Sequence, residues 1–136
     1  MVADQFKCCR YRTDGRLKDS TSFQVTVRTF RFWRVSMFAY IWEFFVDENN
    51  REKFLRYYSP NGDWVTLFRN GQGYIESELL EDQENPQRFL TIDYWESKAD
   101  RDAFRRRYAR EFEMLDQACE AFTRAEKLIG EFSFHK

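Results

Sequence analysis

The stretch Phe38-Ala39-Tyr40-Ile41-Trp42-Glu43-Phe44-Phe45-Val46 decides the fold of this protein. Its residues are mostly aromatic or β-branched, and apolar side chains occupy both of its alternating faces. A strand with this pattern lies in the middle of a sheet and is covered on both sides. The stretch therefore predicts a central strand.

Helical and extended segments follow this strand in a regular order. A helix starts near Asp47 and ends before Pro60, and a short second helical turn extends to Gly71. Residues 73–80 and 88–95 are predicted strands, and residues 127–134 are a predicted edge strand. One apolar stripe at helical spacing lies between the last two strands: Phe104, Tyr108, Phe112, Leu115, Cys119 and Phe122.

The order strand, helix, strand, strand, helix, strand predicts an α+β fold of the ferredoxin-like βαββαβ type. The helices cover one face of a four-stranded antiparallel sheet, and the first and third strands form its central pair. The first strand is apolar on both faces, however, and the helices cover only one of them. We therefore expect a homodimer in which two sheets face each other.

The composition predicts one folded domain that is preceded by a basic N-terminal segment. The chain has 136 residues, of which 43% are hydrophobic and 19% aromatic, and its net charge is −1. Residues 1–36 contain 8 Lys and Arg against 3 Asp and Glu. We expect these residues to form a poorly ordered N-terminal extension, although a presequence or a nucleic-acid-binding arm has a similar composition. The domain then comprises residues 37–136.

Cysteine and histidine usage restricts the chemistry. Adjacent Cys8 and Cys9 with a single further Cys119 form no disulfide framework, which indicates a reducing, cytoplasmic compartment. The single histidine, His135, argues against histidine-based metal sites and catalytic dyads, so no metal site is expected. The longest apolar stretch, residues 35–46, is far shorter than the ~20 residues of a membrane-spanning helix. The nearly balanced charge gives no support to nucleic-acid binding.

Several segments resemble the antibiotic-biosynthesis monooxygenase-like family. They are Tyr40-Ile41-Trp42-Glu43-Phe44, Gly62-Asp63-Trp64-Val65-Thr66-Leu67-Phe68-Arg69, Gly73-Tyr74, Leu79-Leu80, Leu90-Thr91-Ile92-Asp93-Tyr94-Trp95-Glu96-Ser97 and Leu115-Asp116. The resemblance covers Met37 to about Phe134 and implies a dimeric α+β barrel. The family frame is shared by different reactions, so it implies a fold more firmly than an activity.

For catalytic members, the resemblance implies oxygenation of an aromatic, polyketide-like molecule without flavin, haem or metal. The substrate supplies the electrons, because a deprotonated phenol or anthrone can pass an electron to dioxygen. The protein then needs a dry aromatic pocket and a proton acceptor. Relatives that degrade haem use a helix histidine, which residues 98–122 lack. The alternative function is a non-catalytic dimeric protein that binds a small ligand or serves as an accessory.

Glu43, Asp93 and Trp95 are the candidate catalytic residues. Glu43 and Asp93 are isolated acids within apolar strands, where burial is costly unless the acid is paired or functional. If the first and third strands are neighbours, the two carboxylates can approach each other, and a raised pKa would make one of them a base. Alternatively, each acid pairs with a basic residue or faces solvent. Trp95 corresponds to the family's tryptophan on the third strand.

Aromatic side chains are the candidate substrate-binding residues, although ordinary core and dimer packing explains them as well. The set is Tyr40, Trp42, Tyr74, Tyr94 and Phe104. The run Arg105-Arg106-Arg107 is basic, but flanking acids favour ion pairs on a solvated helix face over a site for an anionic ligand.

Overall fold

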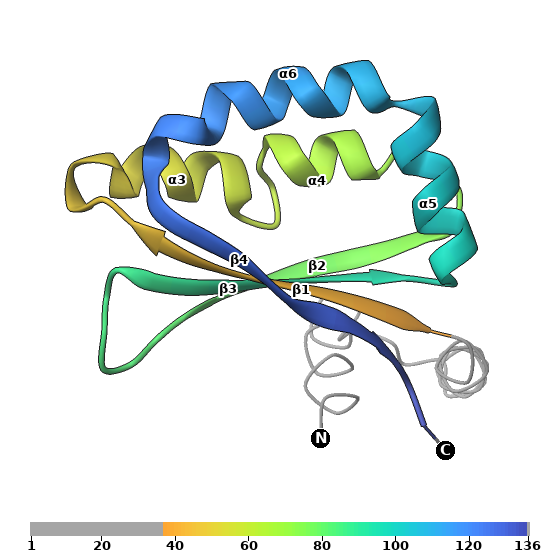
Figure 1. Cartoon of the computed structure of the whole chain (residues 1–136), viewed down its shortest axis with the longest axis horizontal. Helices are drawn as coiled ribbons and strands as arrows, with labels where there is room; N and C mark the ends of the chain where they lie inside the picture. Colours follow the sequence, from red (N-terminus) through yellow and green to blue (C-terminus); the bar gives the residue numbers. More distant parts are fainter. Residues whose placement is uncertain (1–36, 136) are drawn as a thin grey trace, which may run out of the picture. The chain divides into compact units, whose positions relative to one another are not determined.

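The computed structural model describes residues 37–135 and contains a single antiparallel sheet (Figure 1). The strands are β1 (Phe38–Val46), β2 (Tyr74–Glu81), β3 (Arg88–Trp95) and β4 (Thr123–Ser133). Their order across the sheet is β2-β3-β1-β4, so β1 and β3 form the central pair. The ferredoxin-like fold and the central pair are confirmed, whereas the predicted extension at residues 1–36 lies outside the described residues.

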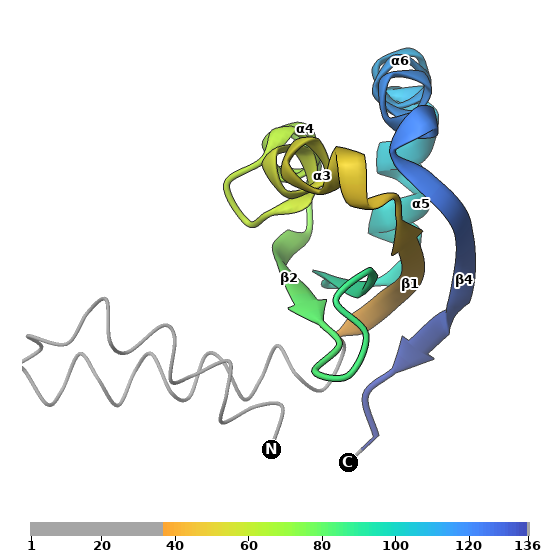
Figure 2. The ribbon, with the colours of Figure 1, turned by 90° about the vertical axis from the view of Figure 1, so that its left-hand side faces the viewer.

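The helices of the described residues all pack on one face of the sheet (Figures 1 and 2). They are the short turns η1 (Glu48–Asn50) and η2 (Glu120–Phe122) and the helices α3 (Arg51–Tyr58), α4 (Asp63–Phe68), α5 (Lys98–Arg107) and α6 (Ala109–Cys119). The apolar stripe predicted as one helix is divided at Tyr108, where ψ is 30°. Figure 1 shows α6 leaving α5 at an angle at this point.

Local sequence signals explain where the elements begin. Ser97 caps α5 by accepting a hydrogen bond from the backbone N–H of Asp100 at 3.1 Å, as the Ser97–Asp100 spacing predicts. Gly73 has a φ of 88°, a conformation that favours glycine, and the chain turns into β2 directly after it. The last strand begins at Thr123, four residues before the predicted segment, directly after η2.

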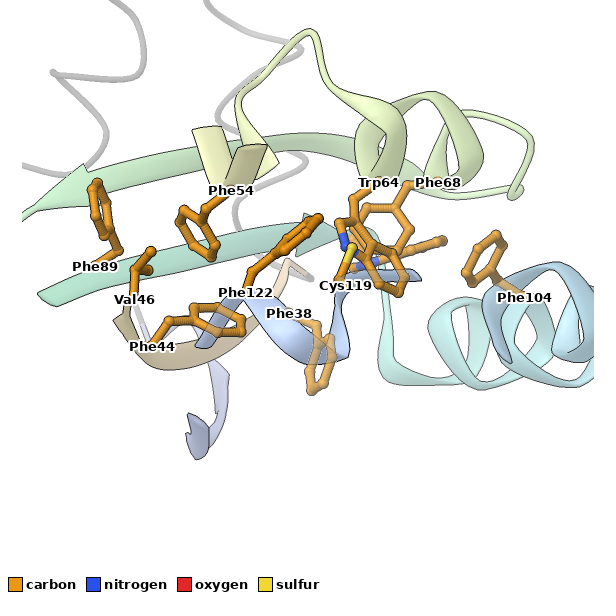
Figure 3. Packing of buried hydrophobic residues seen from close by; sticks show 11 residues of the cluster. Phe38, Phe44, Val46, Phe54, Trp64, Phe68, Phe89, Phe104, Cys119 and Phe122 are labelled. Carbon is orange, nitrogen blue, oxygen red and sulfur yellow. The ribbon is translucent and has the colours of Figure 1, made fainter. Parts of the chain in front are cut away.

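The main core lies between the sheet and the helices and is dominated by aromatic rings (Figure 3). Phe54 and Trp95 are among its largest fully buried side chains. Phe54 stacks on Tyr58 with ring centroids 4.2 Å apart, and Phe44 packs beside both rings. The aromatic residues of the sequence thus serve largely to pack α3 and α4 against β1 and β3.

On the opposite face of the sheet, apolar side chains are covered by no helix of residues 37–135. Met37, Ala39 and Tyr94 form a small cluster there. Leu80 pairs with Leu90 and Phe132 pairs with Ala39, so both belong to this face, and they are 41% and 47% exposed. The described part of the chain therefore leaves open the apolar face from which the sequence predicts a homodimer.

Candidate functional site

A cavity of about 570 Å³ lies between the sheet and the helices. Tyr40, Trp42 and Phe44 of β1 form one wall, because alternate residues of a strand point to the same face. The lining from the other elements comprises Tyr58, Trp64, Val65, Phe68, Ser77, Thr91, Asp93, Trp95, Arg101, Asp102, Phe104, Arg105, Arg106, Phe112, Asp116 and Glu126. A cavity with mostly apolar walls and a few convergent polar groups is typical of sites for small molecules.

Of the two candidate catalytic acids, Asp93 is the one that lines this cavity. It lies on β3 opposite Tyr40 of β1 and is only 7% exposed. Its Oδ1 accepts a hydrogen bond from the Ser77 hydroxyl at 2.5 Å, and the Tyr74 hydroxyl is 2.8 Å from the same Ser77 oxygen. Because Ser77 donates to Asp93, the Tyr74 hydroxyl is the group that donates to Ser77. The hydrogen bonds from Tyr74 to Ser77 and from Ser77 to Asp93 therefore fix the position of Oδ1, one of the two carboxylate oxygens.

The pKa of Asp93 suits a proton acceptor near neutral pH. Burial raises the pKa of this carboxyl from 3.8 to about 6, while the Ser77 hydrogen bond and the charge of Arg101 lower it. Arg101 lines the same cavity, and its guanidinium lies over the Tyr40 ring at 3.7 Å from the centroid. Its side chain is 14% exposed and its Nη1 is 3.4 Å from Asp102. A largely buried cation thus stands near the candidate base.

Four further candidate residues lie on the cavity wall. Trp95 is 1% exposed and packs against Phe104, with ring centroids 5.2 Å apart. Tyr40 and Trp42 make an edge contact at 6.3 Å along β1. All four line the cavity, whereas Tyr74 does not and contributes through Ser77 instead.

The structure does not bring Glu43 and Tyr94 to this cavity, and the expected approach of Glu43 to Asp93 is wrong. Residues adjacent in a strand point to opposite faces, so Glu43 is turned away from Trp42, and Tyr94 from Asp93. Glu43 pairs with Arg88 at 2.6 Å, which is the alternative that the sequence left open for this acid. Tyr94 belongs to the apolar cluster on the uncovered face of the sheet.

Several polar residues of the cavity were not predicted from the sequence, among them Arg101 and Ser77. Arg101 lies three residues before Phe104 and so falls on the apolar stripe of α5, which is a signal that the sequence does contain. Ser77 is a small hydroxyl in a strand with several acids, and nothing in its neighbourhood sets it apart. In addition, Arg105 and Arg106 reach the cavity lining, although the basic run favoured a solvated helix face.

Neither a metal cluster nor a membrane helix occurs among residues 37–135. No group of three or more His, Cys, Asp or Glu side chains in this range is arranged to hold a metal ion. None of the helices in the described part of the chain is long and apolar enough to cross a bilayer.

Solved structures share the fold at low sequence identity. A conserved protein from Methanosarcina mazei Go1 has a TM-score of 0.61 at 12% identity, covering 77% of this chain and 99% of its own. SnoaB, a cofactor-independent oxygenase from Streptomyces nogalater, has a TM-score of 0.55 at 20% identity, covering 74% and 95%. A protein from Pseudomonas aeruginosa has a TM-score of 0.56 at 15% identity, covering 76% and 98%. These likenesses establish the fold alone.

The sequence itself matches a family model. A search of curated proteins finds no match to the chain. The model for antibiotic biosynthesis monooxygenase, in contrast, matches residues 37–124, which span the sheet and helices up to the start of β4. The match covers more than half of the chain and includes Asp93 and Trp95, and the protein therefore belongs to the antibiotic biosynthesis monooxygenase family.

Proposed function

We propose that this protein is a monooxygenase that oxidises an aromatic, polyketide-like molecule with dioxygen and needs no flavin, haem or metal. The observation that carries the proposal is a buried carboxyl, Asp93, on the wall of an aromatic cavity with Arg101 nearby. Membership of the family and the fold shared with SnoaB, a cofactor-independent oxygenase, support it.

The proposed reaction begins with proton transfer to Asp93. A phenol or anthrone in the cavity loses a proton to this carboxylate, and the anion that forms is stabilised by the charge of Arg101. The electron-rich anion passes one electron to dioxygen, and the two radicals combine to a peroxide on the ring carbon.

The peroxide then breaks down to the product. Protonated Asp93 returns its proton to the departing oxygen, the remaining hydrogen on the ring carbon is lost, and the O–O bond breaks. With an anthrone the products are a ketone and water, so a methylene and one dioxygen are consumed, and with a phenol a ring C–H is consumed and a quinone forms. In both cases the substrate supplies all four electrons. Exclusion of water by the aromatic walls, including Trp95 and Phe104, protects the peroxide and strengthens the electrostatic contacts.

Oxygen uptake tests this proposal. The protein is incubated with a panel of polyketide phenols and anthrones without added cofactor, and dissolved oxygen is followed. We expect uptake that falls by roughly two orders of magnitude or more in Asp93→Asn, since general base catalysis contributes about that much. Trp95→Phe tests the cavity wall with less loss of volume than alanine. Unchanged uptake in both variants would contradict this site.

The same panel separates the oxygenase from a protein that only binds a ligand. Compounds that bind in the cavity but cause no oxygen uptake would assign the non-catalytic alternative. The cavity supports both functions, but a buried carboxyl with a raised pKa favours the enzyme, because binding an aromatic ring does not require it.

Assembly and location form the remaining part of the proposal. We propose a homodimer that covers the open face of the sheet, because Leu80 and Phe132 are exposed there. The cytoplasm is the proposed location on the basis of the cysteine pattern, and a small aromatic molecule is the proposed partner.

A further inference from the structure

Thr91 carries a hydroxyl on the cavity wall that the proposed reaction does not yet use. The residue is 7% exposed and lines the cavity together with Asp93 and Trp95, the alternate residues of β3 that face the helices. Within residues 37–135 its hydroxyl makes no hydrogen bond, and its oxygen is not fully enclosed by other atoms. The hydroxyl is therefore open to the cavity and available to a bound molecule.

The surroundings of Thr91 in the sheet do not require a hydroxyl. Its register partners are Trp42 of β1 and Leu79 of β2, and Phe89 precedes it on the same face of β3. Valine has the same branched shape and would pack against these apolar side chains without a polar atom to desolvate. Because a buried hydroxyl without a hydrogen bond costs free energy, its presence here points to a role in the cavity.

Asp93 and Thr91 follow each other along one wall of the cavity. They are two residues apart on β3, which corresponds to about 7 Å along the strand. Tyr40 lies opposite Asp93 in the register of β1 and β3. Trp42 lies opposite Thr91, and its ring is 6.3 Å from that of Tyr40. A substrate ring that packs on this wall thus has one edge at the carboxylate and the opposite edge at the hydroxyl.

This spacing leaves Asp93 distant from the oxygen that departs. In the proposed reaction Asp93 accepts a proton from a hydroxyl on one edge of the ring and returns it to a peroxide on the other edge. Its Oδ1 is held by Ser77, so the carboxyl does not turn freely toward that second edge. The Thr91 hydroxyl can carry the proton across this gap, because a hydroxyl is both a donor and an acceptor.

We infer that Thr91 is a catalytic residue whose hydroxyl gives its hydrogen to the departing peroxide oxygen. Protonated Asp93 replaces that hydrogen, so the carboxylate is restored and Thr91 is unchanged. The ring carbon then loses its remaining hydrogen as a proton, and the electron pair of that C–H bond forms the second C–O bond. The pair of the O–O bond leaves with the departing hydroxide, which takes up the proton to become water. The inference rests on the proposed function, because it adds a residue to that reaction.

Thr91→Val tests this assignment, because it removes the hydroxyl and keeps the branched shape. The ligand is the compound of the phenol and anthrone panel that wild type turns over fastest. Without oxygen, the absorbance of this compound reports its binding and the formation of its anion, and both should remain as in wild type. With oxygen, uptake should fall by about two orders of magnitude, the usual effect of losing a proton donor. Mass spectrometry of acid-quenched samples should then detect the hydroperoxide, which has the mass of the substrate plus both oxygen atoms.

Two further variants serve as controls. Thr91→Ser keeps the hydroxyl, so its oxygen uptake should lie much closer to wild type than to Thr91→Val. Thr66→Val makes the same chemical change on α4, where the Thr66 hydroxyl donates to the Gly62 carbonyl at 2.9 Å and does not line the cavity. Its oxygen uptake should equal that of wild type. A thermal melt of each variant confirms that it folds.

The inference is overturned if Thr91→Val turns over like wild type, if it already fails to form the substrate anion without oxygen, or if Thr91→Ser is as slow as Thr91→Val. Oxygen uptake by wild type that persists in Thr91→Val contradicts the role of Thr91 and leaves the oxygenase in place. A wild-type protein that forms the substrate anion but takes up no oxygen contradicts the oxygenase, and the role of Thr91 with it.

Discussion

Replacing Asp93 with Asn should stabilise the fold at neutral pH. The folded state holds this carboxyl at 7% exposure and raises its pKa to about 6, mainly through burial. In the unfolded chain the same group has a pKa of about 3.8. Between these two values the folded state binds more protons than the unfolded state, so the free energy of unfolding falls as the pH rises through this window. Above about pH 6 the loss of folding stability caused by ionised Asp93 is fully present, and below about pH 4 this loss is absent.

The size of the effect follows from the two pKa values. They differ by about two units, and each unit corresponds to about 1.4 kcal/mol of differential stabilisation, so ionised Asp93 costs the fold roughly 3 kcal/mol at neutral pH. Asn has nearly the same size and its amide oxygen can still accept the Ser77 hydrogen bond. The variant should therefore gain up to about 3 kcal/mol at pH 7.5 and almost nothing near pH 4.

Urea denaturation of both proteins near pH 4 and near pH 7.5 measures this difference, and comparison at equal pH cancels the other titrating groups. Asp102→Asn is the matched control on the same cavity. A hydrogen bond from Lys98 lowers the pKa of Asp102, so its stabilising effect is present at neutral pH and is lost on acidification. The control should thus be less stable than wild type at pH 7.5. If Asp93→Asn is equally stabilising at both pH values, or is destabilising at pH 7.5, the argument from burial is wrong.

Three further outcomes are expected. Ser77→Ala removes a hydrogen bond that lowers the pKa of Asp93, so carbon NMR of the carboxyl groups should show this pKa rising by about one unit, with Ser77→Thr close to wild type. Glu43→Gln should leave oxygen uptake within about twofold of wild type, since general base catalysis requires contact with the substrate and this residue faces away from the cavity. Leu80→Glu together with Phe132→Glu should shift the sedimentation of a dimer to that of a monomer, because charges cannot be buried between apolar sheet faces. A wild-type protein that sediments as a monomer at high concentration would contradict the homodimer directly.

The elements of the fold were predictable because their hydrophobic patterns are strong. The predicted strands at 38–46 and 88–95 have the bounds of β1 and β3, and the order of elements alone identifies the ferredoxin-like type. The break between α5 and α6 was not predictable, because the apolar spacing continues through Tyr108 without a glycine or proline. Tertiary packing, which the local sequence does not record, decides such a break.

Strand geometry alone could have shown that Glu43 and Tyr94 do not share a face with the other candidate residues. Asp93, Tyr94 and Trp95 are consecutive in one strand, and alternation prevents all three from facing one cavity. The same rule separates Trp42 from Glu43. The sequence could not decide which of the two sets of alternate residues in each strand faces the helices, because β1 and β3 carry apolar side chains on both faces.

The contrast between the two strand acids is the best argument that the cavity has a chemical role. Glu43 has an arginine at 2.6 Å and thus the partner that a half-buried carboxylate needs. Asp93 is more deeply buried, its hydrogen bond comes from the neutral hydroxyl of Ser77, and its ionised form costs the fold stability. An apolar side chain at this position would avoid that cost without disturbing β3. A proton acceptor, on the other hand, must keep lone pairs free on the cavity side and a pKa near the working pH, and Asp93 meets both conditions at the expense of stability.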